Sequence, residues 1–132
     1  MKFNHLEGYE SVTLPTETIN GKRYYVTPDG NKYPSVTTVT GMHSAKWVAQ
    51  WRKRVGAEVA DKISSQAAGR GSRYHYMQED FLNNLDITEK LKKATPLDQM
   101  MFNQTRELTE KIGDIYMLEG SLYSDDLCIA GR

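Results

Sequence analysis

Residues 47–79 read WVAQWRKRVGAEVADKISSQAAGRGSRYHYMQE and carry a clear helical pattern. Apolar side chains recur every four residues in its first part, at Trp47, Trp51, Val55, Val59, Ile63 and Ala67. This period predicts an amphipathic helix that buries one apolar stripe in a core. Gly69-Arg70-Gly71 is expected to end that helix, and Ser72 to cap a second helix that runs to about Asn83.

Upstream of this stretch the sequence predicts a β-hairpin. Aromatic and β-branched residues at 22–27 and 32–33 flank a turn sequence, Pro28-Asp29-Gly30-Asn31. Two interpretations stay open for the next segment, because Ser35 is a good helix N-cap whereas the β-branched residues 36–39 suit a strand. Residues 1–20 are expected to form an irregular arm or a short strand.

Downstream, a further helix is predicted to begin at Thr95, with Pro96 in its first turn and Asp98 near the third position. It is predicted to end at Gly113. Its predicted buried stripe comprises Leu97, Met101, Leu108 and Ile112.

Residues 114–118 and 127–130 are expected to form two strands around a turn at residues 124–126. The chain stops at Gly131-Arg132, directly after the second expected strand. We therefore expect it to be an N-terminal fragment of a larger domain.

The composition is typical of one globular domain or part of one. The chain has 132 residues, a mass of 15.1 kDa, a formal net charge of zero and a mean hydropathy of −0.63. No run approaches the roughly 18 apolar residues of a membrane helix, and the first residues lack the apolar part of a secretory signal. Cys128 is the one cysteine, which excludes an internal disulfide. A reducing, cytoplasmic location without a membrane partner is expected.

The zero net charge conceals two blocks of opposite sign. Residues 41–75 contain seven basic and two acidic residues, and residues 76–132 contain six basic and eleven acidic residues. This order suits a protein that binds a polyanion and gathers carboxylates for a metal, although helix solubility also produces it. Arg52 and Arg54 lie off the apolar stripe and are candidate DNA-binding residues, with a solvated helix face as the alternative. For the tryptophans, stacking on unpaired bases is the alternative to core packing.

Residues 69–79 carry the candidate chemistry. His75 and Glu79 are four apart, so a helix would place them on one face with Cβ atoms about 5–6 Å apart. An imidazole beside a carboxylate ligates or orients a divalent metal, whereas a solvated surface pair is the plain alternative. The candidate phosphate-binding residues at the expected helix start, whose free N–H groups favour an anion, are Arg70, Ser72 and Arg73.

The motif Gly71-xxx-His75-xxx-Glu79 resembles the first helical motif of RecB-like nucleases in the PD-(D/E)XK superfamily. Further matching segments follow the same order along the chain, at residues 33–39, 51–56, 67–71, 119–123 and 129–132. Together they are similar to phage-type exonucleases, relatives of the mitochondrial genome maintenance exonuclease. The similarity extends from about Lys22 to the C-terminus.

The resemblance implies a role for each matching residue. His75 would contribute a nitrogen to a divalent metal, Mg²⁺ or Mn²⁺, and Glu79 would support that site. Glu119 matches an acidic position in the strand before the second motif. Gly131 matches the glycine that opens the second motif, Gly-x-x-Asp, so the metal-binding Asp and the later Asp/Glu-x-Lys motif would follow Arg132. The chain would hold about half of the site and is expected to be inactive alone.

The expected fold is α/β: a PD-(D/E)XK-like mixed sheet flanked by helices, truncated after its first core strands, with an N-terminal hairpin. Its expected parts are an arm at 1–20, a hairpin at 21–40, a helical region at 41–112 and core strands at 113–132. The expected function is metal-dependent exonucleolytic cleavage of DNA, at single-stranded or duplex ends, in phage replication or recombination. One alternative is a non-catalytic DNA-binding or interaction module. Another is a helical enzyme whose His/Glu metal pair is unrelated to nucleases.

Overall fold

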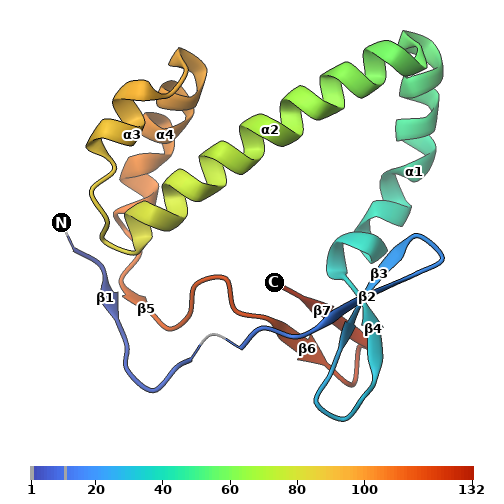
Figure 1. The fold of residues 1–132 in the computed structure, drawn as a ribbon, viewed down its shortest axis with the longest axis horizontal. Helices are drawn as coiled ribbons and strands as arrows, with labels where there is room; N and C mark the ends of the chain where they lie inside the picture. Colours follow the sequence, from blue (N-terminus) through green and yellow to red (C-terminus); the bar gives the residue numbers. More distant parts are fainter. Residues whose placement is uncertain (1, 11) are drawn as a thin grey trace. The chain divides into compact units, whose positions relative to one another are not determined.

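The computed structural model describes residues 2–10 and 12–132, which form four helices and seven short strands (Figure 1). Contacts divide the chain into two compact units. The helical unit comprises Met1–Gly8 and Ala57–Tyr116, and the sheet unit comprises Tyr9–Gly56 and Met117–Arg132. The mixed α/β class is confirmed, but the described strands make one three-stranded and two two-stranded sheets instead of a single mixed sheet. None of the described helices has the length and apolar character needed to cross a bilayer.

Three antiparallel strands open the sheet unit: β2 (Thr16–Ile19), β3 (Lys22–Val26) and β4 (Lys32–Pro34). Asn20 and Gly21 join β2 to β3 with φ angles of 51° and 75°, the two positive values that a type I′ hairpin turn requires. β3 and β4 pair as the predicted hairpin, with Tyr25 opposite Tyr33, which confirms that expectation. The N-terminal arm therefore ends in a true strand, one of the two possibilities left open for residues 1–20.

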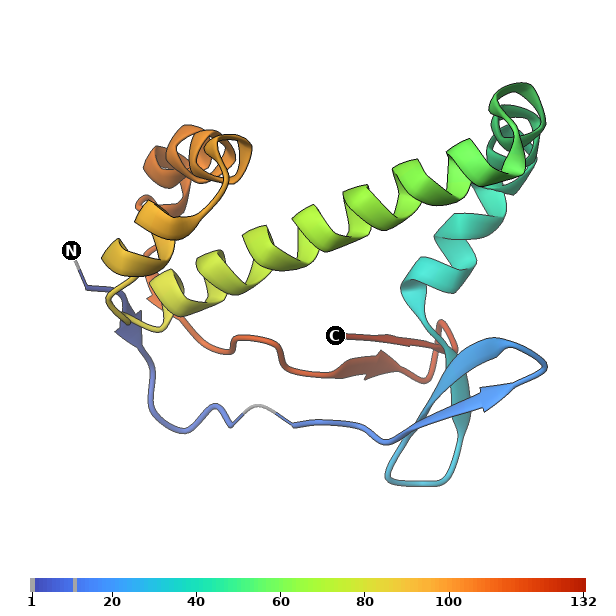
Figure 2. The same ribbon diagram turned by 45° about the horizontal axis from the view of Figure 1, so that its top comes forward.

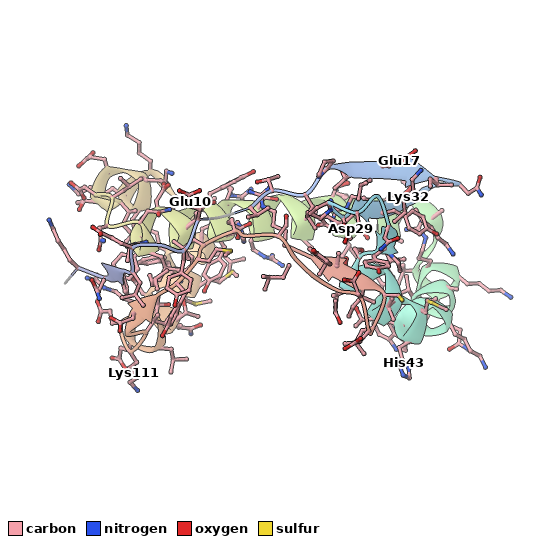
Figure 3. The ribbon with its side chains drawn as sticks, turned by 90° about the horizontal axis from the view of Figure 1, so that it is seen from below. Glu10, Glu17, Asp29, Lys32, His43 and Lys111 are labelled. Atoms are coloured by element: carbon pink, nitrogen blue, oxygen red, sulfur yellow. The ribbon has the colours of Figure 1, made fainter. Side chains whose placement is uncertain are left out.

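The sheet unit closes with a second hairpin, made of β6 (Leu122–Ser124) and β7 (Ile129–Gly131). Its core packs Leu14, Tyr25 and Ala130 together, with Tyr33 against them. The Tyr33 hydroxyl donates a 2.6 Å hydrogen bond to Asp125 in the turn between β6 and β7. On the three-stranded sheet, Glu17 and Lys32 form a 2.7 Å ion pair (Figure 3).

The two strands predicted near the C-terminus are only partly correct. β5 (Asp114–Ile115) has two residues and pairs in parallel with β1 (Asn4–His5) inside the helical unit. β7 pairs instead with β6, because the chain turns at Glu119, whose φ is 54°, before β6 begins. The local pattern predicted a strand at this place but could not reveal that β5 pairs with β1, because β1 lies about 110 residues earlier in the chain.

Ser35 ends the first sheet and begins α1 (Val36–Val55), so the helical interpretation of residues 36–39 is confirmed. Its hydroxyl accepts a 3.0 Å hydrogen bond from the Thr38 backbone N–H, which is the N-cap geometry. α1 ends at Gly56, whose φ of 88° lies in a region that L residues rarely adopt. The predicted stripe between Trp47 and Ala67 is therefore divided between two helices.

The burial expected for that stripe is wrong. No described residue of α1 is buried, and Trp47 is 65% exposed. Val59 and Ile63 on the next helix are 49% and 45% exposed. A period of four places side chains on one face, but it does not supply the neighbour against which that face must pack.

The helical unit is built on α2 (Ala57–Leu82), which runs without interruption through Gly69-Arg70-Gly71 (Figures 1 and 2). The predicted break there, with Ser72 as a new N-cap, is wrong. A helical glycine costs only about 1 kcal/mol relative to alanine, so a long helix that packs against α4 just beyond residues 69–71 tolerates two of them. The helix ends at Leu82, shortly before Asn84 takes a positive φ of 61°.

α2 packs against α3 (Thr88–Lys93) and α4 (Pro96–Thr109). The core of this unit consists of Met77, Ile87 and Phe102, with Phe81, Leu91 and Ala94 around them. The Phe81 ring meets Phe3 and Phe102 edge to face, at centroid distances of 5.2 and 5.4 Å. Phe3 thereby ties the N-terminal segment to α2.

α4 begins as predicted, with Thr95 as N-cap and Pro96 in the first turn, but its predicted buried stripe is wrong. Leu97, Leu108 and Ile112 are 42%, 65% and 45% exposed, and Met101 is half-buried. Asp98 and Phe102 are completely buried instead. The face of α4 that meets α2 is largely polar, so an apolar period could not identify it. The helix also ends at Thr109, four residues before the predicted Gly113.

Candidate functional site

His75 and Glu79 lie one turn apart in α2, as their spacing predicted. The His75 Nε2 atom is 4.0 Å from the Glu79 Oε2 atom, and the two side chains are 52% and 33% exposed. The His75 ring also meets the Tyr76 ring edge to face at a centroid distance of 5.9 Å. The pair is therefore open to solvent and close enough to act on one ligand.

A polar contact between α2 and α4 fixes the direction in which this pair points. Tyr74 donates a 2.7 Å hydrogen bond to the Thr105 hydroxyl. Gln78 donates to the same hydroxyl at 2.9 Å and accepts from Thr109 at 3.3 Å. Tyr74 and Gln78 each precede a member of the His75–Glu79 pair by one residue. Because Tyr74 and Gln78 face α4, His75 and Glu79 lie on the adjacent side of α2, which is exposed to solvent.

Sequence reasoning missed this polar contact. The signal was present as two polar pairs at a spacing of four, Tyr74 with Gln78 and Thr105 with Thr109. Residues four apart share one face of a helix, so each of these pairs lies on a single face. Apolar periodicity does not identify them, because it assigns polar positions to the solvent side.

Arg73 and Asp98 form the second link between α2 and α4. The Arg73 Nε–H donates to Asp98 Oδ2 at 2.8 Å, and the Arg73 side chain remains 55% exposed while that of Asp98 is 1% exposed. This hydrogen bond is the main cause that lowers the pKa of Asp98, opposed by burial, with further lowering from Thr95 and from the charges of Arg73 and Arg70. Asp98 is therefore a buried carboxylate held in its charged form.

The anion site predicted at a helix start near residues 69–73 is wrong. Arg70, Ser72 and Arg73 lie in the middle of α2, where the backbone N–H groups belong to the helix ladder. Arg70 is half-buried and Ser72 is exposed, and the Arg73 charge is matched by Asp98. DNA binding by their side chains stays a prediction, without the help of a helix N-terminus.

Arg52 and Arg54 lie in the last turn of α1, together with Lys53. Three cations at a helix C-terminus are favourable because the carbonyl ends carry partial negative charge. α1 has no acidic residue anywhere along its length. These two arginines belong to the sheet unit, whereas Arg70, Ser72 and Arg73 belong to the helical unit, so the predicted DNA-binding residues divide into two groups.

Glu119 does not lie in a strand, which corrects the position expected for it. It occupies a turn between β5 and β6 with a φ of 54°. Its carbonyl accepts a 3.1 Å hydrogen bond from Arg132, and its carboxylate lies 3.4 Å from the same Nε atom. The next residue is Gly120, where an added Cβ would displace the Met117 side chain, whose sulfur lies 1.7 Å from the position of that Cβ. Glu119 belongs to the sheet unit, and the His75–Glu79 pair to the helical unit.

The described residues do not complete a metal site. Within residues 2–10 and 12–132 there is no group of three or more His, Cys, Asp or Glu side chains that could hold an ion. Mg²⁺ takes an octahedron of oxygen ligands, and one imidazole with one carboxylate supplies too little of it. The role of His75 as a ligand of Mg²⁺ or Mn²⁺ stays a prediction.

Comparison of the chain with protein-family models, with curated proteins and with solved structures finds no match. The resemblance to RecB-like nucleases stays a prediction that rests on the motif residues themselves. A functional assignment therefore rests on two features, the geometry of the His75–Glu79 pair and the positive charge of α1.

Proposed function

We propose that this chain is part of a metal-dependent DNA exonuclease of the RecB-like, PD-(D/E)XK type. The observation that carries the proposal is the His75–Glu79 pair, exposed on α2 with 4.0 Å between Nε2 and Oε2. The order of the motif segments around it supports the same assignment. In this proposal β6 and β7 are the first strands of the mixed core sheet, and phage replication or recombination in a host cytoplasm is the setting.

Within this proposal each residue has a limited task. His75 presents an imidazole nitrogen, and Glu79 orients it or accepts its proton. Arg52 and Arg54 hold the phosphate backbone through charge. When bound, the divalent metal would polarise the phosphate, but the further carboxylates that it needs are assigned to sequence following Arg132. No hydrolytic step is therefore assigned to these 132 residues alone.

The test compares this chain with the protein extended to the stop codon of its gene. Each is incubated with end-labelled single-stranded DNA and Mg²⁺, and release of the label is followed. We expect release by the extended protein only, and a loss of at least about 100-fold in the His75→Ala variant, since removing a metal-site residue costs at least what removing its supporting partner does. His43→Ala, an exposed histidine of α1, is the matched control.

A second candidate function is a non-catalytic DNA-binding module on the same scaffold. It is favoured by the acid-free helix α1, with Lys46, Arg52, Lys53 and Arg54. The incomplete metal group among the described residues agrees with it. This candidate predicts DNA binding that weakens with salt, and an extended protein that leaves the label intact in both Mg²⁺ and Mn²⁺.

A further inference from the structure

A cavity of about 480 Å³ opens on the helical unit beside the His75–Glu79 pair. Four of its lining residues come from one face of α2, at the helical spacing of three and four: Arg73, Tyr76, Met77 and Asp80. The opposite wall comes from α3 and the segment after it, with Lys90 and Lys93. Its size lies in the range of about 300–1,000 Å³ that is typical of small-molecule sites.

The wall of this cavity contains two ion pairs and one further cation, Lys93. Arg73 pairs with Asp98, and Lys90 pairs with Asp80, so these four charges are matched within the wall. Lys93 is exposed and forms no ion pair with any residue that the structure describes. The cavity therefore has one cation available for an anionic group, such as a phosphate.

The remaining wall suits a flat ring. Tyr76 is 60% exposed although it lines the cavity, so one part of its ring is open to a ligand. Met77, which is only 3% exposed, forms an apolar floor beside it. Aromatic side chains bind nucleobases by stacking, and they do so with little regard to the base.

The cavity adjoins the candidate site through the contact between Tyr76 and His75, whose ring centroids are 5.9 Å apart. We propose that it binds one nucleotide, with the base against Tyr76 and Met77 and the phosphate at Lys93. In the nuclease this ligand would be the terminal nucleotide of a DNA strand, and that part of the inference rests on the proposed function. One base and one phosphate match the ring surface and the single unmatched cation.

The probe for this site is thymidine 5′-monophosphate, titrated into the uniformly ¹⁵N-labelled 132-residue chain. We expect saturable shifts of backbone amides in residues 73–98. Tyr76→Ala and Lys93→Glu should each weaken binding by about tenfold or more, because each removes one of the two recognition elements. Tyr123→Ala and Lys111→Glu, which change an exposed tyrosine and an exposed lysine outside the cavity, are matched controls and should leave binding unchanged.

Thymidine without its phosphate separates the two recognition elements. It should bind more weakly than the monophosphate and should be insensitive to Lys93→Glu, while Tyr76→Ala still weakens it. Inorganic phosphate alone should shift amides near Lys93 only. Circular dichroism of each variant checks that the helices remain folded.

The inference is overturned if the monophosphate causes no saturable shift, if the shifts fall outside residues 73–98, or if both cavity variants bind as the parent does. These outcomes are independent of cleavage. Nucleotide binding without cleavage by the extended protein refutes the proposed nuclease and leaves the cavity assignment intact. Cleavage without nucleotide binding refutes the cavity alone.

Discussion

At the scale of single residues, Asp98 is the most constrained group of the helical unit. A fully buried carboxylate is costly unless hydrogen bonds satisfy it, and here the Arg73 guanidinium and the Thr95 hydroxyl supply them. The same contact holds residue 73 of α2, two positions before His75. Asp98 is therefore a positioning residue for the His75–Glu79 pair, because it acts on that pair through α2.

The lowered pKa of Asp98 predicts how the helical unit responds to acid. Its contribution to stability is present above the ordinary Asp pKa of about 4 and is lost as pH falls through the lower, folded-state value. Asp98→Asn should remove this part of the acid dependence and lower the melting temperature at pH 7. Thermal unfolding followed from pH 7 to pH 2 measures both effects. Equal pH profiles for the parent and the variant would contradict the assignment.

In the sheet unit, the pKa of Tyr33 is raised, whereas that of Asp98 in the helical unit is lowered. Its hydrogen bond to Asp125 is the main cause that raises its pKa to about 12, with burial and the charge of Asp125 adding to it. The stability from this bond is complete below the ordinary tyrosine pKa of about 10 and is lost as pH rises through about 12.

The raised pKa of Tyr33 predicts how its phenol titrates at alkaline pH when Asp125 is changed. Asp125→Asn should return the pKa of Tyr33 toward about 10, whereas Asp126→Asn, one residue further, should leave it near its raised value. Absorbance at alkaline pH measures the titration, and Tyr33→Phe identifies which of the tyrosines is responsible. A Tyr33 that titrates alike in the parent and in Asp125→Asn would show that the hydrogen bond does not form in solution.

At the scale of elements, α2 shows which features local sequence reveals and which it does not. The hairpin of β3 and β4, the N-caps Ser35 and Thr95, and the i,i+4 relation of His75 and Glu79 follow from local rules and are confirmed. The continuity of α2 through residues 69–71 does not follow from them, because it is decided by contacts with α4 on one side and by helix propagation on the other. The β1–β5 pair and the Arg73–Asp98 link join residues distant in the chain, so no local pattern predicts them.

The stability of a Gly71→Ala variant tests whether α2 is one continuous helix. An added Cβ at this position would meet no atom within 4 Å, and its backbone is helical. Gly71→Ala should therefore stabilise the protein by about 0.5–1 kcal/mol in urea unfolding. Gly56→Ala is the matched contrast and should destabilise, because its φ of 88° strains an L residue. Destabilisation by Gly71→Ala would instead indicate a break between two helices.

At the scale of the whole molecule, the two units have separate small cores. The helical unit centres on Phe102, which is completely buried between Phe81 and Met77, and the sheet unit centres on Tyr25 and Ala130. With so few buried apolar side chains, each of them accounts for a large share of its unit's stability. Large apolar residues such as Trp47 are exposed instead.

Phe102→Ala should therefore be among the most damaging single changes. Loss of a buried phenylalanine costs about 3–5 kcal/mol, which is enough to unfold a small unit. Chemical unfolding monitored by far-ultraviolet circular dichroism, with the exposed Leu108→Ala of the same helix as control, measures the difference. If the two variants lose stability equally, Phe102 is not the centre of the core.

The division of the candidate residues between the units has a consequence for function. The His75–Glu79 pair and the cavity beside it belong to the helical unit, whereas Arg52, Arg54 and Glu119 belong to the sheet unit. The proposed nuclease site also needs further carboxylates, because the described residues bring together no group of three or more metal-binding side chains. The proposal therefore predicts activity only for the extended protein.

The most direct measurement of this claim is the initial rate at which the protein, extended to the stop codon of its gene, releases label from end-labelled single-stranded DNA in Mg²⁺. We expect clear release by the parent, a loss of at least about 100-fold in His75→Ala and a loss of about 10- to 100-fold in Glu79→Gln. Intact DNA with the parent in both Mg²⁺ and Mn²⁺, or equal rates for the parent and His75→Ala, would contradict the assignment of this chain to a DNA exonuclease.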